Sequence, residues 1–163
     1  MDGKLRNMTA LYLFKDERVL LLYKEGGRVV NHVWTGSAGG HFEAYELNDA
    51  KACVLRELNE ELGLQPGDIE GLSLRYITLR STNGEIRQNY YFFAALKEHV
   101  DENISSNEGV CRWFSLNEIS SLEMPFTAKY VIEHFCKVGH LTNTVYVGVA
   151  TSNRVDFYDL PET

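Results

Sequence analysis

The most informative stretch of the sequence is Arg56-Glu57-Leu58-Asn59-Glu60-Glu61-Leu62-Gly63-Leu64. It ends a longer segment, Asn48 to Leu62, in which apolar residues recur at four-residue spacing. An Asn/Asp start and a glycine after the last apolar residue are typical helix-capping signals, so we predict a helix over this segment. With about 100° of rotation per residue, Glu57, Glu60 and Glu61 share one flank of that helix.

These three carboxylates occupy the C-terminal half of the predicted helix, where the helix dipole and their mutual repulsion disfavour negative charge. The arrangement is favourable if a cation lies among them. Hard divalent ions such as Mg²⁺ bind carboxylate oxygens and complete their shell with water and phosphate oxygens. The alternative is a solvated acidic face, with Arg56 and Lys51 as local counter-charges. The helix alone leaves both interpretations open.

A glycine-rich passage precedes the helix, and the two segments together resemble the motif of the Nudix hydrolases, which are related to MutT. That motif runs Gly, five residues, Glu, seven residues, Arg-Glu, an aliphatic residue, any residue, Glu-Glu, any residue, Gly and an aliphatic residue. Gly40 and Glu46 match its first part, and residues 56–64 match its second part at every fixed position. Nine residues separate Glu46 from Arg56, and we place the two extra ones in the loop around Leu47 to Asp49.

The resemblance implies hydrolysis of a nucleoside diphosphate linked to a further group, through attack of a metal-activated water on phosphorus. By motif position, Glu57, Glu60 and Glu61 would be metal ligands, and the Gly39 carbonyl would add a further oxygen. Glu57 or Glu60 would also orient or deprotonate the water. Arg56 would hold the carboxylates by charge-assisted hydrogen bonds. The implied cofactor is Mg²⁺, or Mn²⁺ in its place.

Four further residues are candidates for the site that the resemblance implies. Glu108 would be the acidic residue that family members often supply from a loop, as ligand or general base. Other carboxylates compete for that role, namely Glu98, Asp101 and Glu102. Lys24 ends a predicted strand and would contact a substrate phosphate as a point charge. Gly40 would lie against the substrate, and Phe126 stands where some relatives recognise the base.

The remaining patterns predict strands and two further helices. The strand signals are β-prone runs and an Asn-Gly turn, and they cover Met8–Phe14, Arg18–Tyr23, Leu72–Leu79, Ile86–Leu96 and Val110–Phe114. The aromatic run Tyr90-Tyr91-Phe92-Phe93 predicts a strand that is buried on both faces. We expect helices at Leu116–Leu122 and Thr127–Val138, and a terminal hairpin at Thr144–Tyr158 that turns near Ser152-Asn153.

Together with the resemblance, these elements predict an α/β (α+β) fold, a Nudix-type α/β/α sandwich with a mixed β-sheet between helices. A length of 163 residues fits a single domain over residues 1–163. Residues 144–158 would be a C-terminal β-hairpin extension. We expect that hairpin to pack at a homodimer interface or over the substrate cleft.

The charge balance and the cysteines limit the partners and the compartment. The net charge of −7, from 16 Lys+Arg and 23 Asp+Glu, disfavours binding to nucleic acid polymers and anionic membranes. Three widely spaced cysteines without a C-x-x-C pair suggest neither a disulfide framework nor a zinc site. No apolar run reaches the roughly 20 residues that span a bilayer, and the first ten residues lack the apolar core of a signal peptide. We therefore expect a cytoplasmic protein whose partner is a small-molecule nucleotide.

Several functions fit the resemblance. The leading hypothesis is a MutT-like pyrophosphohydrolase that acts on nucleoside triphosphates, including oxidised ones such as 8-oxo-dGTP. Hydrolysis of ADP-ribose or of dinucleoside polyphosphates is the alternative, because the motif binds the diphosphate that all these substrates share. A non-catalytic nucleotide sensor is an alternative of another class, although such domains usually lose motif carboxylates. An isoprenoid diphosphate isomerase needs a positioned cysteine, which the sequence does not suggest.

Overall fold

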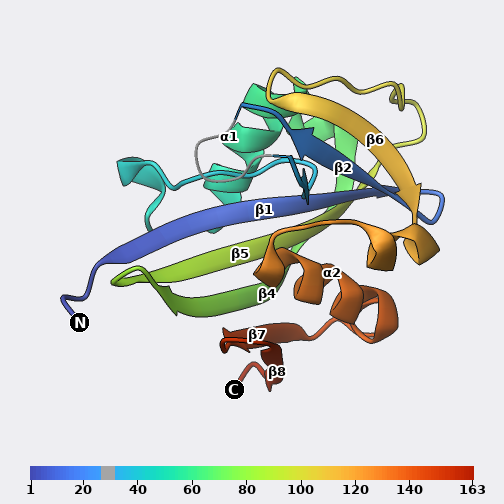
Figure 1. Ribbon diagram of the computed structural model, residues 1–163. Helices are drawn as coiled ribbons and strands as arrows, with labels where there is room; N and C mark the ends of the chain where they lie inside the picture. The colour runs from blue at the N-terminus through green and yellow to red at the C-terminus, as the bar shows by residue number, and fades with distance from the viewer. Residues whose placement is uncertain (27–31) are drawn as a thin grey trace.

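The computed structural model describes residues 1–26 and 32–163 (Figure 1). The described strands are β1 Leu5–Lys15, β2 Arg18–Lys24, β3 Trp34–Thr35, β4 Ile69–Thr82, β5 Glu85–Leu96, β6 Gly109–Ser115, β7 Val145–Ala150 and β8 Val155–Leu160. The α-helices are α1 Ala50–Leu62 and α2 Phe126–Lys137. Short 3₁₀ helices are η1 Ala44–Glu46, η2 Pro66–Asp68, η3 Leu116–Ser121 and η4 Gly139–Leu141.

The strands form one mixed sheet. Its order is β3-β2-β1-β5-β4-β7-β8, and β6 pairs with β2 off this path. β1 runs parallel to β5 and β4 runs parallel to β7, whereas β4 with β5 and β7 with β8 are antiparallel hairpins. Asn83 and Gly84, at the β4–β5 turn, have φ of 53° and 75°. A type I′ hairpin turn requires such positive values at both central residues.

The two α-helices cover opposite faces of the sheet, as Figure 1 shows with β1 and β5 between them. Alternate residues of the central strands therefore enter two separate cores. Leu11 and Phe92 pack with Val54 and Leu58 of α1. The other core lies beneath α2 and includes Tyr12, Tyr76, Tyr91, Phe93, Val131 and Ile132. The α/β/α sandwich and the aromatic strand buried on both faces are confirmed.

A glycine-rich segment fills the gap where β2 diverges from β1. The two strands pair over Leu13–Lys15 and Arg18–Leu20. Beyond that point, the Leu11 N–H donates to the Ala38 carbonyl at 2.7 Å, and the Thr9 N–H donates to the Gly40 carbonyl at 2.9 Å. The buried Ser37 hydroxyl joins both strands, because it accepts from the Leu13 N–H at 2.8 Å and donates to the Leu20 carbonyl at 2.6 Å. This segment is therefore fixed beside β1.

Both ends of α1 follow the local sequence. The Asp49 carboxylate accepts from the Ala52 N–H at 3.0 Å, so the helix begins after Asp49 rather than at Asn48. Gly63 ends it with a φ of 67°, a left-handed conformation that glycine adopts without a steric penalty. No helix in the described part of the chain is long and apolar enough to cross a membrane.

The C-terminal elements differ in part from the expectation. The segment predicted as a helix at Leu116–Leu122 is the 3₁₀ helix η3, whose Ser115 N–H donates to the Glu118 carboxylate at 2.8 Å. The terminal hairpin is present as β7 and β8, and β7 pairs with β4. Its residues extend the sheet at the far side of β4, at the lower edge of the view in Figure 1.

Candidate active site

The Arg56 guanidinium is the centre of a network on the flank of α1. Its Nε donates to Glu46 Oε1 at 2.6 Å, and its Nη2 donates to Glu46 Oε2 at 3.0 Å. Its Nη1 donates to Glu57 Oε1 at 2.8 Å and to Glu60 Oε2 at 2.9 Å. Bidentate guanidinium–carboxylate pairs of this kind are strong and geometrically specific. Arg56 therefore fixes three carboxylates relative to one another.

Glu46 occupies the interior of this network despite the two extra residues that follow it. Its side chain is 1% exposed. It ends the short helix η1, where its Oε2 also accepts from the Glu43 N–H at 2.9 Å. The hydrogen bond from Arg56 is the main reason that the pKa of Glu46 falls to about 2. The extra residues lie between η1 and α1, and they leave the Glu46–Arg56 contact intact.

Two glycines let the loop pass closely between β1 and α1. A Cβ atom on Gly40 would overlap the Glu57 carboxylate, and one on Gly39 would overlap the Thr9 carbonyl oxygen. Glu57 is consequently buried beneath the loop, and this burial raises its pKa, although the Arg56 hydrogen bond acts in the opposite direction. The loop thus limits the access of water to one side of Glu57.

Glu61 lies one turn further along α1 with much less compensation. It is 8% exposed, and its Oε2 is a buried atom without a hydrogen-bond partner. Lys24 Nζ lies 3.7 Å from Glu61 Oε1 and 3.7 Å from Glu108 Oε2. Burial raises the pKa of Glu61 to about 7, in spite of the lysine. A cation other than Lys24 would be strongly attracted to this position.

The structure separates the competing loop carboxylates. Glu108 shares Lys24 with Glu61 and so adjoins the carboxylates of α1. Glu102 instead accepts from Arg18 Nη2 at 3.0 Å. Asp101 accepts from the Asn103 N–H at 2.9 Å within its own loop. For Glu98, no contact with the site is seen in the described ranges.

The carboxylates on α1 are the type of ligand that a hard divalent cation prefers. Glu57 and Glu61 are buried carboxylates with raised pKa values, and Glu61 Oε2 is unpartnered. Glu60 has a side chain that is 57% exposed, and it would have to leave Arg56 to reach an ion bound at Glu61. Within residues 1–26 and 32–163, no three or more His, Cys, Asp or Glu side chains already converge on a point that could hold a metal. The residue types fit the ion, and the side chains would have to converge as it binds.

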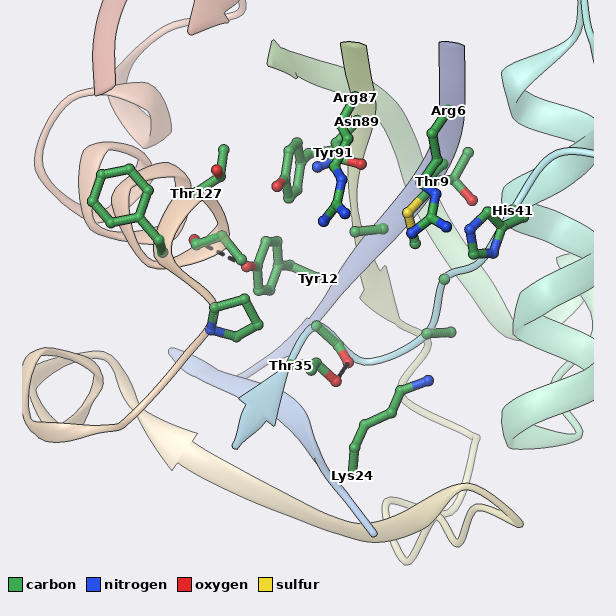
Figure 2. A pocket seen from close by; sticks show the side chains of 18 of the residues that line it. Arg6, Thr9, Tyr12, Lys24, Thr35, His41, Arg87, Asn89, Tyr91 and Thr127 are labelled. Carbon is green, nitrogen blue, oxygen red and sulfur yellow. Dashed lines mark hydrogen bonds between the residues drawn. The ribbon is translucent and has the colours of Figure 1, made fainter. Parts of the chain in front are cut away.

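A cavity of about 230 Å³ adjoins Glu61 on the face of the sheet that carries α2 (Figure 2). Four of the expected site residues line it, namely Lys24, Gly39, Glu61 and Phe126. Other expected site residues do not line it, namely Gly40, Arg56, Glu57, Glu60 and Glu108. The terminal hairpin does not contribute to the lining either, contrary to one of the two expectations for it.

Sequence reasoning missed most of the cavity wall. Tyr12 and Tyr91 line it from β1 and β5, and Asn89 lies beside them. Three arginines also line it, from three different strands: Arg6, Arg80 and Arg87. Figure 2 shows Lys24 reaching toward the cavity from one side, while Arg6 and Arg87 approach from the other. The cavity therefore connects the carboxylate helix with a cationic wall.

Comparisons with known proteins identify a matching family model and similar folds. The family model of the NUDIX domain matches residues 4–135. The solution structure of the E. coli ORF135 protein is similar over 86% of this chain and 95% of its own, with a TM-score of 0.67 and 20% identity. The mutator MutT protein from Bacillus halodurans is similar over 97% and 99%, with a TM-score of 0.64 and 23% identity.

A third similar structure is a binary complex of a C. elegans Ap4A hydrolase. It covers 85% of this chain and 99% of its own, with a TM-score of 0.64 and 16% identity. At such identities these structures establish the fold. Among curated protein sequences there is no significant match.

Proposed function

Because the chain belongs to the NUDIX domain family, we propose that it is a Mg²⁺-dependent pyrophosphohydrolase of nucleoside triphosphates, including oxidised ones such as 8-oxo-dGTP. The observation that carries this proposal is the buried, unpartnered Oε2 of Glu61 at the wall of a cavity. A buried carboxylate is stable in its charged form only when it is paired, and a bound cation would supply the missing partner. The adjoining space of about 230 Å³ has aromatic and polar walls suited to a nucleoside.

In this proposal, Glu57, Glu60 and Glu61 hold the metal, together with the Gly39 carbonyl. Bound Mg²⁺ would neutralise the diphosphate and acidify a water molecule. Arg56 engages Glu57 through Oε1, which leaves Oε2 to orient the attacking water. The raised pKa of Glu57 suits it to accept a proton from that water at Oε2.

Other side chains would bind the rest of the substrate. Lys24 would contact a phosphate oxygen, and it would leave Glu61 as the metal takes its place there. Glu108 would assist through Lys24, to which it is bound at 3.7 Å. Tyr12, Tyr91 and Phe126 would contact the base, since they supply apolar surface to the cavity. The scissile anhydride would then lie between Lys24 and the α1 carboxylates.

Hydrolysis of ADP-ribose or of dinucleoside polyphosphates is a second candidate. The three arginines in the cavity wall favour the dinucleoside polyphosphates, because a simple triphosphate would place its phosphates at the carboxylate helix and leave the arginines to face the base. The longer phosphate chain of a dinucleoside polyphosphate would engage both regions. The C. elegans Ap4A hydrolase shares the fold, which is compatible with either candidate.

The direct test is release of phosphate or pyrophosphate from a panel of substrates, with and without Mg²⁺. The panel contains 8-oxo-dGTP, the common dNTPs, ADP-ribose and dinucleoside polyphosphates. We expect metal-dependent turnover of at least one triphosphate, with the Glu57→Gln variant as the matched inactive control. If no member is turned over with Mg²⁺ or Mn²⁺, the hydrolase proposal fails. A measurable Kd for one of them would then favour a nucleotide sensor.

A further inference from the structure

Three arginines form a row across neighbouring strands on the cavity face of the sheet. Arg6 of β1 pairs in register with Arg87 of β5, and Arg87 pairs in register with Arg80 of β4. Side chains of residues directly opposite one another project from the same face of a sheet. All three line the cavity described above, and Figure 2 shows Arg6 and Arg87 side by side at its wall. We call this set the arginine row.

The arginine row carries more positive charge than its surroundings neutralise. Glu85 forms ion pairs with two of its members, since Glu85 Oε1 lies 2.8 Å from Arg87 Nε and 3.4 Å from Arg6 Nε. Arg80 has no carboxylate partner among the described residues, and its guanidinium lies 5.3 Å from the centre of the Phe126 ring. Three cations thus share one anion, in a chain whose net charge is −7. The unpaired charge is equivalent to two positive units.

The residues that precede the arginine row along the cavity wall, and the exposure of the row itself, show that its positive charge is accessible from the cavity. Met8 pairs with Asn89, and Ala10 pairs with Tyr91, so the cavity wall changes from apolar to polar before it reaches the arginine row. The side chains of Arg6 and Arg87 are 29% and 25% exposed, so they are partly desolvated rather than freely hydrated. Their Nη atoms have no hydrogen-bond partner within the parts of the chain that the structure describes. They are available as donors at the cavity wall.

We propose that the arginine row binds a phosphate monoester of the substrate that lies outside the hydrolysed diphosphate, such as a 2′- or 3′-phosphate of the ribose. This inference rests on the proposed function only for the position of the diphosphate at α1. One guanidinium is enough to recognise the edge of a neutral base, and the other two would remain uncompensated. A doubly charged phosphate matches the excess of the row, and guanidinium forks match its oxygens. Among the diphosphate-containing nucleotides that the site accepts, those with an additional phosphate would therefore bind most tightly.

The test compares ligands that contain no anhydride bond, so it is independent of turnover. Binding of 5′-AMP, adenosine 2′,5′-bisphosphate and adenosine 3′,5′-bisphosphate is measured by calorimetry with Mg²⁺ in phosphate-free buffer. We expect at least one bisphosphate to bind about tenfold more tightly than AMP, as charge-assisted hydrogen bonds to a phosphate would provide. A ratio near one in the wild-type protein overturns the proposal.

Variants of the row identify the group responsible. Arg80→Gln removes a guanidinium that has no ion pair to lose, so the fold should be retained. We expect it to reduce the bisphosphate-to-AMP affinity ratio about threefold or more, and the Arg80→Gln/Arg87→Gln pair to bring the ratio close to one. Arg112→Gln is the matched control, because Arg112 is exposed on β6 and does not line the cavity. An unchanged ratio in folded Arg80→Gln and double variants contradicts the assignment.

Two further measurements separate binding of a substrate phosphate from binding of free phosphate, and separate the arginine row from the hydrolase proposal. If the row binds free phosphate instead, AMP binding will strengthen when inorganic phosphate is added and the bisphosphates will show no advantage, which overturns the proposal. Turnover of NADPH against NADH, and of coenzyme A against its dephospho form, tests the same preference in kcat/KM. A binding preference without turnover of any substrate would support the arginine row while the hydrolase proposal fails.

Discussion

Glu46, at the end of η1, and Glu61, in α1, are both buried glutamates, yet their environments are opposite. Glu46 accepts two hydrogen bonds from Arg56 and one from its own backbone turn, and its pKa falls to about 2. Glu61 shares a lysine at 3.7 Å, retains an unpartnered oxygen, and has a pKa raised to about 7 by burial. The first carboxylate is compensated within the protein. The second is compensated only in part, and a bound cation would pair its remaining oxygen.

The difference in hydrogen bonding and charge pairing separates a structural carboxylate from a candidate metal ligand without reference to their positions in the motif. Buried charges are stable when they are paired and hydrogen-bonded, and they are unfavourable otherwise. Glu57 combines both situations, because one oxygen is bound to Arg56 while burial still raises its pKa. Changes at these three positions should therefore have different consequences for activity and stability.

The largest effect on activity is expected at Glu57, which is bound to Arg56 through one oxygen and is still raised in pKa by burial. Glu57→Gln keeps the shape of the side chain and removes a charge from the proposed metal and water site. We expect kcat to fall roughly a thousandfold or more, since loss of such electrostatic and base contributions has effects of that size. The control is Glu70→Gln, at an exposed glutamate of β4 away from the cavity. Near-normal turnover of folded Glu57→Gln would refute its role.

The compensated carboxylate should matter most for folding. Glu46→Ala leaves Arg56 without its bidentate partner and creates a space in a fully buried position. We expect the free energy of unfolding to fall by about 3 kcal/mol, the size typical of breaking a buried ion pair. Urea denaturation at pH 7 measures it. A loss below about 1 kcal/mol would show that Glu57 and Glu60 alone suffice to hold Arg56.

Removing the charge of Glu61 should raise the free energy of unfolding in metal-free buffer, whereas removing that of Glu46 should lower it. The folded pKa of Glu61 is raised above its ordinary value of 4.5, so the folded state binds more protons between about pH 4.5 and 7. The free energy of unfolding should therefore fall as the pH rises through that window. Glu61→Gln should remove part of this slope and stabilise the metal-free protein at pH 8 by about 1–2 kcal/mol.

Added metal provides the second half of that test. Mg²⁺ at pH 8 should raise the melting temperature of the wild-type protein and have a smaller effect on Glu61→Gln, because a ligand that binds the folded state stabilises it. Equal effects of Mg²⁺ on both proteins would mean that Glu61 does not bind the ion. Glu108→Gln serves for comparison, since its half-exposed side chain should change stability by less than about 0.5 kcal/mol.

Local signals predicted much of the fold. The Asp49 cap, Gly63 and the Asn83-Gly84 turn each determine the backbone within a few residues, so α1 and the β4–β5 hairpin are found close to their expected bounds. The parallel pairing of β1 with β5 has no local signal, because the two strands are joined only through the tertiary structure. The bridging role of Ser37 depends on the same distant contacts.

The candidate site also contains residues that local sequence signals predict and residues that only the tertiary structure brings together. The motif identified the residues that the structure brings together on α1, and Glu108 was selected from a loop that the structure does place beside Lys24. Arg80 and Arg87 could have been found by counting outward from the Asn83-Gly84 turn, since hairpin partners are symmetric about it. Arg6 could not, because its place in the row depends on the parallel pairing of β1 with β5.

The Glu46–Arg56 contact also determines how much length variation the loop before α1 tolerates. The entropy of closing a flexible loop grows only with the logarithm of its length, so nine residues instead of seven change it by about 0.2 kcal/mol. The bidentate ion pair outweighs that difference many times over. Insertions between η1 and α1 should therefore be nearly neutral, whereas the same insertions inside α1 would change the orientation of its carboxylates relative to one another. The Glu46–Arg56 contact therefore tolerates more variation in the number of residues between the two than the fixed seven-residue spacing of the motif allows.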